Sequence, residues 1–349
     1  MGILLSPGTY NLQLTFTPTQ IAKIRWSIQT SVLFMRGAES QECRSDQKLC
    51  KLKIPVFTNP ASCCGAVDCH CIYALITFPL LFLLAIQSFY SMIISFAAMI
   101  IILRLVNGHS HRERIRSKFF LVWGILSYVQ LLLLFQLVVV PQLKILLSEN
   151  AVLTSLVVAA LYFAQCSRRN PGILNPHRNE DETKILIEEE GVREGRCAVC
   201  LLPMPPRTSH CLMCGVCVLR RDHHCIWLDV CIGANNHRHF ILGLFTLAAG
   251  LFYGANLTLT SICQPMMFWG LFLVPQSCPG VFDAWLDAWV YVSAVYAALV
   301  ACLVTVVLLQ QLLMVACNTT VYEIRKYQQL NGSLKPASLI SNCFNFWVK

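Results

Sequence analysis

Cysteine and histidine residues crowd into one short segment of the chain. Seven of the 19 cysteines lie between residues 197 and 231, together with three histidines. The segment begins with Cys197-Ala-Val-Cys200, and a two-residue gap lets both sulfurs bind one metal ion from a tight turn. Two tetrahedral zinc ions need eight ligands, which leaves one cysteine and one histidine over. The segment therefore predicts two structural zinc ions and a spare Cys–His pair.

The order of these residues narrows the class of zinc protein. The full pattern is Cys197-x2-Cys200-x9-His210-Cys211-x2-Cys214-x2-Cys217-x4-Asp222-His223-His224-Cys225-x5-Cys231. A RING-type ubiquitin ligase would close with a second CxxC after the histidine, whereas Cys225 and Cys231 are separated by five residues. The spacing of Cys225 and Cys231 therefore argues against a RING-type ubiquitin ligase.

The same pattern, followed by Gly233, Asn236 and Phe240, resembles the cysteine-rich domain of the DHHC protein S-acyltransferases. The resemblance implies two zinc quartets. One contains Cys197, Cys200, His210 and Cys217, and the other contains Cys211, Cys214, His224 and Cys231. This assignment leaves His223 and Cys225 without a metal, as the ligand count requires.

The residues left over could carry out acyl transfer. A thioester is attacked by a thiolate, and a free thiol has a pKa of about 8.5, so Cys225 needs a base. His223 is the predicted general base, and Asp222 is predicted to orient its ring. The resemblance implies that Cys225 takes a palmitoyl group from palmitoyl-CoA and passes it to a cysteine of a membrane-associated protein. The zinc ions are expected to be structural.

Three arginines and a tryptophan near the motif are candidates for contacts with CoA or lipid. Arg207 and Trp227 are predicted to contact CoA, and Arg207 fits the family pattern best. Arg220 and Arg221 could bind CoA phosphates, lipid headgroups or the acidic linker with about equal weight. Asp229 stands where many family members have Asn.

Two further segments resemble family motifs with changes. Asn170-Pro171-Gly172 resembles an Asp-Pro-Gly motif. Thr319-Thr320-Val321-Tyr322-Glu323 resembles a Thr-Thr-x-Glu motif with one extra residue, so either the threonines or Glu323 can be in register. This leaves the expected contact from the tail to Asp222 open.

The elements that position these residues must lie in a membrane. The chain is 56% hydrophobic and 13% charged, whereas a soluble domain carries about a quarter charged residues. The net charge of +9 is scattered between apolar stretches, which favours a membrane surface and argues against nucleic acid. Residues 72–103 carry no charge, and one helix over them would reach roughly 48 Å against a core of about 30 Å, so we expect two helices.

The predicted fold is an α-helical polytopic membrane protein with six transmembrane helices and a small cytosolic zinc-bound domain. The predicted spans are 72–88, 89–105, 119–140, 150–166, 240–262 and 288–316. Around them we expect a cytosolic N-terminal region (1–71), a linker (167–196), the DHHC domain (197–239) and a cytosolic tail (317–349). With this arrangement, 26 of the 27 basic residues lie on one side, as cytosolic loops require.

Alternatives of other classes remain. A non-catalytic zinc-bearing adaptor is disfavoured by the intact Asp-His-His-Cys, and a transporter by the lack of ionisable residues in the spans. Cys63, Cys64, Cys69 and Cys71 could be S-acylated, bind a metal with His70 or be plain thiols. Gly2 lies in a myristoylation-like sequence, for which a chance match is the favoured interpretation. The expected location is the Golgi apparatus or endoplasmic reticulum, with the active site in the cytosol.

Overall fold

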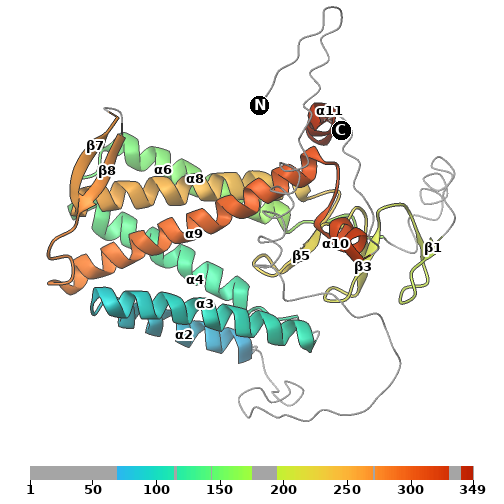
Figure 1. The fold of residues 1–349 in the computed structure, drawn as a ribbon, viewed down its shortest axis with the longest axis horizontal. Helices are drawn as coiled ribbons and strands as arrows, with labels where there is room; N and C mark the ends of the chain where they lie inside the picture. Colours follow the sequence, from blue (N-terminus) through green and yellow to red (C-terminus); the bar gives the residue numbers. More distant parts are fainter. Residues whose placement is uncertain are drawn as a thin grey trace, which may run out of the picture.

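A computed structural model describes residues 69–113, 116–142, 144–174, 195–269, 272–329 and 339–348. The N-terminal region up to residue 68, with Gly2, Cys63 and Cys64, and most of the linker lie outside the described residues. Figure 1 shows long helices running side by side, with small β-hairpins at both ends of the bundle. The long helices are α2 (Cys69–Ala85), α3 (Phe89–Arg112), α4 (Phe119–Leu134), α6 (Leu147–Ser167), α8 (His237–Ile262) and α9 (Trp285–Ala316).

Five helices among the described residues are long and apolar enough to cross a membrane. They are α3, α6, α8, α9 and a continuous helix over Phe119–Gln142, in which α4 runs on through η2 (Phe135–Val139) and α5 (Val140–Gln142). The sixth apolar helix, α2, has 17 residues, or about 26 Å, slightly less than the hydrocarbon thickness. The predicted count of six spans is therefore not confirmed, whereas the polytopic helical fold is.

The charge-free stretch from residue 72 to 103 forms two helices, separated at Ile86–Ser88. Ser88 caps the second helix, because its hydroxyl accepts a hydrogen bond from the Ser91 backbone N–H at 3.2 Å. The Ser91 hydroxyl in turn accepts from the Ser88 N–H at 2.8 Å. This reciprocal cap satisfies two backbone donors at the break and allows α3 to start inside the apolar stretch.

The bundle has an aromatic core and one close helix pair. Phe78, Phe82 and Trp123 are buried together, and Tyr296 of α9 packs against them. Gly250 of α8 faces α6, where a Cβ atom would lie 3.5 Å from Leu156 Cβ. Small residues allow close packing of helices in membranes, where water does not drive association.

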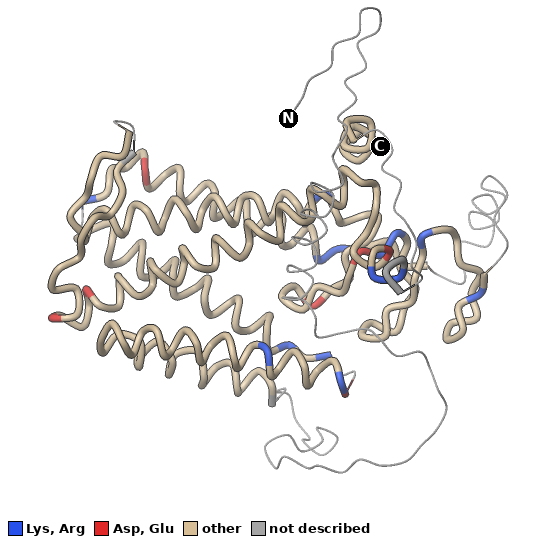
Figure 2. The backbone as a smooth tube through the Cα atoms, viewed as in Figure 1, with Lys and Arg blue, Asp and Glu red and all other residues tan. Residues whose placement is uncertain are grey.

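The two ends of the bundle differ in charge and chemistry. Figure 2 shows Lys and Arg gathered at the end that carries the cysteine-rich hairpins, while the other end holds acidic residues and few basic ones. At that other end, β7 (Gln264–Phe268) and β8 (Phe272–Ser277) form a hairpin closed by a Cys263–Cys278 disulfide. Disulfides persist in oxidising compartments, so this end fits the lumen and the opposite end fits the cytosol. This disulfide was not predicted from the sequence.

The disulfide gives a direct test of orientation. In protein isolated from membranes under thiol-blocking conditions, we expect a linked Cys263–Cys278 peptide, because the lumen is oxidising and the cytosol is not. The cysteines of the predicted zinc quartets should be recovered as free thiols in the same peptide map. Blocked free thiols at Cys263 and Cys278 in the native protein would contradict the orientation.

Candidate zinc centres and thiol site

The cysteine-rich segment folds into three successive two-stranded hairpins. The strand pairs are β1 (Gly195–Arg196) with β2 (Pro203–Met204), β3 (Ser209–Cys211) with β4 (Val216–Val218), and β5 (His223–Cys225) with β6 (Val230–Ile232). Each predicted zinc quartet takes two ligands from one hairpin, at or next to its turn, and two from paired strands of the next hairpin; Cys211 of the second quartet is the last residue of β3. Two metal sites of this kind would fasten the three hairpins in series.

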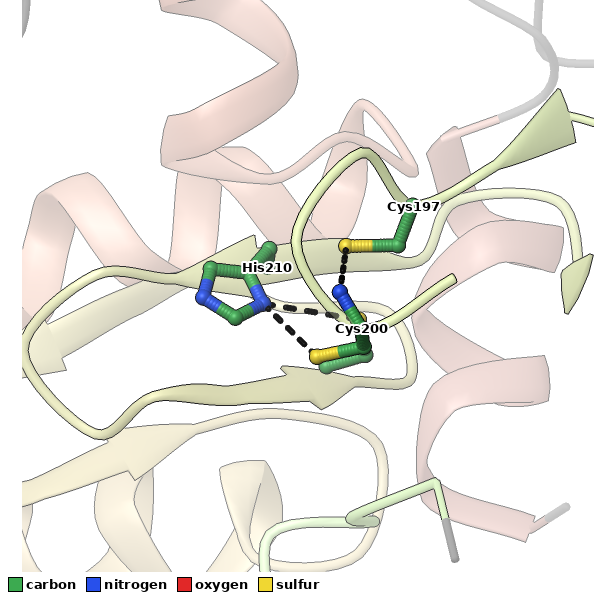
Figure 3. A group of neighbouring side chains, drawn as sticks. Cys197, Cys200 and His210 are labelled. Carbon is green, nitrogen blue, oxygen red and sulfur yellow. Dashed lines mark hydrogen bonds between the residues drawn. The ribbon is translucent and has the colours of Figure 1, made fainter. Parts of the chain in front are cut away.

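The first quartet contains Cys197, Cys200, His210 and Cys217. Figure 3 shows the first three of these side chains close together. The first two lie in the turn between β1 and β2, and His210 and Cys217 are directly opposite each other on β3 and β4. His210 Nδ1 lies 3.2 Å from Cys200 Sγ and 3.7 Å from Cys217 Sγ.

The second quartet contains Cys211, Cys214, His224 and Cys231. His224 and Cys231 are opposite each other on β5 and β6. His224 Nδ1 lies 3.3 Å from Cys214 Sγ, and the sulfurs of Cys231 and Cys214 are 3.6 Å apart. In a tetrahedral zinc site with Zn–S bonds of about 2.3 Å, sulfurs are about 3.8 Å apart. The donor atoms of each quartet lie within 4.8 Å of one another, so the residues present fit a zinc ion.

On β5 the predicted metal ligand His224 lies on one face of the strand, and the predicted reactive pair His223 and Cys225 lies on the other. Successive side chains of a strand point to opposite faces. His224 points toward its quartet, so His223 and Cys225 share the other face, where their charges interact. Cys225 is buried with Ile232 and Phe240, and the His223 ring packs edge-on against Phe240 at 5.4 Å. The structure therefore brings together the predicted spare Cys–His pair.

Asp222 completes a chain of three groups. Its Oδ2 atom lies 2.7 Å from His223 Nδ1 and also accepts a hydrogen bond from Gln311 Nε2 of α9 at 3.0 Å. Its Oδ1 atom accepts from the Val321 backbone N–H at 2.8 Å. Asp222 is almost fully buried, and a buried carboxylate is stable only when its oxygens are hydrogen-bonded.

These contacts favour an ion pair of imidazolium and thiolate. Burial opposes protonation of His223, but contacts with Asp222 and Cys225 outweigh burial and raise its pKa to about 9. Burial raises the pKa of the Cys225 thiol, whereas its hydrogen bond with His223 and the ring's charge bring the pKa below its ordinary value. Burial works against ionisation of Asp222 as well, yet the hydrogen bond from His223 keeps its pKa well below the usual range. A thiolate held in this way is a nucleophile.

The tail contact that the sequence left open is made by the backbone. Val321 begins α10 (Val321–Gln329), and its N–H donates to the Asp222 carboxylate, while the Tyr322 N–H donates to the Asp222 carbonyl oxygen at 3.1 Å. Thr320 and Glu323 cap the helix reciprocally at 2.8 and 3.2 Å. Glu323 also binds Arg207 through both carboxylate oxygens, at 2.6 and 2.8 Å. The extra residue therefore places Thr320, rather than Thr319, as the cap.

The Asn170-Pro171-Gly172 segment and Asn236 tie the hairpins to the membrane helices. Asn236 donates from Nδ2 to the carbonyls of Ser167 at the end of α6 and Cys231 on β6. Its Oδ1 accepts from the Gly233 N–H at 2.8 Å. A Cβ atom on Gly233 would lie 2.6 Å from the Pro171 carbonyl oxygen. Only glycine fits here, which explains a residue that the sequence motif contains.

Replacing this glycine should destabilise the domain. Gly233→Ala forces the Pro171 and Leu219 carbonyl groups away, which corresponds to overpacking at a cost of about 1–3 kcal/mol. We expect a lower melting temperature in detergent. Gly195→Ala, in the same domain but with open space around its Cβ position, is the matched control. Equal melting temperatures for the two variants would contradict this close packing.

The predicted CoA contacts lie at the end of the bundle that carries the cysteine-rich hairpins. Arg207 binds Glu323 and also donates to Asn318, while Arg220 donates to the same Asn318 side chain at 2.9 Å. Arg221 is buried and donates to Ser209 Oγ at 2.6 Å. Trp227 is 43% exposed and packs edge-on against Phe120 of α4, at a ring distance of 5.2 Å. Contact of Arg207 and Trp227 with CoA stays a prediction.

Comparison with known proteins defines the family. Residues 192–328 match the family model described as DHHC palmitoyltransferase. Palmitoyltransferase ZDHHC23-B of Danio rerio is 30% identical over 299 residues, covering 74% of this chain and 69% of the relative. Palmitoyltransferase ZDHHC23 of Mus musculus is 27% identical over 62% of this chain and 60% of its own length. The human ZDHHC23 is 26% identical, over 62% and 63%.

The fold and the site define a polytopic membrane protein with a zinc-binding cysteine-rich domain and an activated thiol. The chain belongs to the DHHC palmitoyltransferase family, whose members are protein S-acyltransferases, and within it resembles the ZDHHC23 branch.

Proposed function

We propose that this chain is a protein S-palmitoyltransferase that works through an acyl-enzyme on Cys225. The observation that supports it is the Cys225–His223–Asp222 chain, in which the base touches the thiol and the carboxylate orients the base. The arrangement matches the roles of a Cys-His-Asp triad.

The reaction has two thioester exchanges. The Cys225 thiolate attacks the carbonyl carbon of palmitoyl-CoA, a new C–S bond forms, and the bond to the CoA sulfur breaks. His223 holds the proton of Cys225 and gives it to the departing CoA sulfur. A substrate cysteine then attacks the acyl-enzyme, its proton passes to His223, and Cys225 leaves as a thiolate. Asp222 orients the ring throughout and stabilises it whenever it carries the proton.

The zinc ions have a structural role in this proposal. The eight residues of the two quartets would hold two Zn²⁺ ions, each with four protein ligands and no open position for substrate. Zinc supplies folding free energy to the hairpins. Cys225 and His223 are free for chemistry because they face away from the second quartet.

The position of the thiol suits an acyl chain in the membrane. Ile226, next to Cys225, packs against the aromatic core of the helix bundle. A sixteen-carbon chain directed along the same path would gain about 0.8 kcal/mol for each buried methylene. Membrane-associated proteins with cytosolic cysteines are the proposed acceptors. We place the enzyme in Golgi or endoplasmic reticulum membranes with Cys225 facing the cytosol, supported by the charge asymmetry of the bundle.

The nucleophile can be separated from the zinc ligands by mutation. Cys225→Ser should abolish the hydroxylamine-labile acyl group formed with palmitoyl-CoA while keeping two zinc ions per chain. Cys214→Ala, which removes a ligand, should lose zinc and lower the yield of folded protein, because metal binding is coupled to folding. Mass spectrometry for the acyl site and elemental analysis for zinc check both. An acyl group that persists at other cysteines in Cys225→Ser would make the chain a substrate only, as for a zinc-bearing adaptor.

The role of the carboxylate can be tested by an isosteric change. Asp222→Asn places an amide against two donors, His223 Nδ1–H and Gln311 Nε2, so the ring loses its orientation and charge stabilisation. We expect the rate of acyl-enzyme formation to fall about 100-fold or more. Single-turnover measurements with labelled palmitoyl-CoA check the rate, and zinc content serves as the control for folding. An unchanged rate would remove Asp222 from the mechanism.

A further inference from the structure

The connection between α3 and α4 reaches the turn that carries Cys225. Arg116 lies in this connection, 113 positions before Asp229 and outside the matched family domain. Its Nε atom donates to Asp229 Oδ1 at 2.6 Å, and its Nη2 atom donates to the Asp229 carbonyl oxygen at 2.8 Å. One guanidinium therefore holds both the side chain and the backbone of a single residue.

Asp229 occupies the most constrained position of that turn. It precedes β6 in the β5–β6 hairpin and has a φ of +52°, in the left-handed region that few residues other than glycine adopt. Its side chain is buried, and Oδ1 lies 3.9 Å from Nε2 of the zinc-quartet residue His224. A buried carboxylate in a strained turn needs an external partner to keep its geometry, and Arg116 is that partner.

The same turn leads directly from the nucleophile. Cys225 ends β5 and is paired with Val230 at the start of β6, so residues 226–229 form the turn that joins them. Asp229 is the last residue of this turn, so a shift of Asp229 is transmitted to Val230 and to its strand partner Cys225. Small displacements of a reacting group lower the rate strongly.

We propose that Arg116 is a positioning residue for acyl transfer: by clamping Asp229, it fixes the turn between Cys225 and Val230 and with it the position of the nucleophile at the end of β5. The proposal rests on the proposed function of Cys225. It links the helices that precede the family domain to the reacting centre. Many family members carry Asn in place of Asp229, so the charged clamp is a departure of this sequence from the family pattern.

Two variants distinguish the Arg116–Asp229 clamp from a general effect of surface charge. Lys118 is an exposed cation in the same connection, two residues from Arg116, and Lys118→Ala is the matched control. Arg116→Lys keeps the charge but replaces the planar fork by a point charge, which cannot donate to the carboxylate and carbonyl in the same geometry. The Arg116 side chain is about half exposed, so we expect both Arg116 variants to fold.

The experiment combines hydrogen exchange with single-turnover acylation of the full chain in nanodiscs. For Arg116→Ala we expect amide exchange in residues 226–231 to be at least about tenfold faster, with unchanged exchange in residues 209–218. Acyl-enzyme formation from palmitoyl-CoA should slow by about 10- to 100-fold at two zinc ions per chain. Arg116→Lys should be intermediate in both readouts, and Lys118→Ala should match the wild type.

Unchanged exchange and an unchanged acylation rate in Arg116→Ala would overturn the proposal. Loss of zinc in this variant would also overturn it, since Arg116 would then support the metal site rather than the turn. The exchange measurement does not depend on acyl transfer. If the wild type forms no acyl-enzyme, the proposed function fails, while exchange still decides whether the clamp exists.

Discussion

The alternation of side chains along β5 is the constraint on which the site depends. His224 faces a metal quartet, so its neighbours His223 and Cys225 must face the opposite way, and they do so together. A strand held at one face by a metal cannot slip or rotate. Zinc binding at the second quartet would therefore also hold the base His223 and the nucleophile Cys225 in place on β5.

Contacts from the membrane helices and the tail also position the residues of the site. Asp222 receives one hydrogen bond from Gln311 of α9 and one from the start of α10, so the orientation of His223 depends on the helix bundle. Asn236 joins the end of α6 to β6 at the start of α8. Through these contacts the thiol lies where the cysteine-rich hairpins meet the apolar core, which suits the proposed reaction between a soluble CoA thioester and a membrane-bound cysteine.

The sequence predicted the parts of the site that depend on local spacing. Paired Cys gaps and the count of ligands predicted two zinc ions with one cysteine and one histidine left over, because hairpin geometry follows from short-range order. The resemblance to the family then supplied the membership of each quartet and the spare His223–Cys225 pair. Contacts between distant segments could not be predicted in this way. The Val321 N–H that binds Asp222 is a backbone group with no side-chain signature, and the Arg116–Asp229 pair joins residues 113 positions apart. The predicted first span is not confirmed, because α2 has 17 residues and falls short of the hydrocarbon thickness.

Native mass spectrometry of the purified chain after incubation with palmitoyl-CoA tests the central claim most directly. The account predicts a species with two zinc ions and one palmitoyl group, and peptide mapping of that species should place the acyl group on Cys225. A chain that carries its acyl group on one of the eight quartet cysteines or histidines, or that is acylated at Cys225 after both zinc ions are removed, would contradict it.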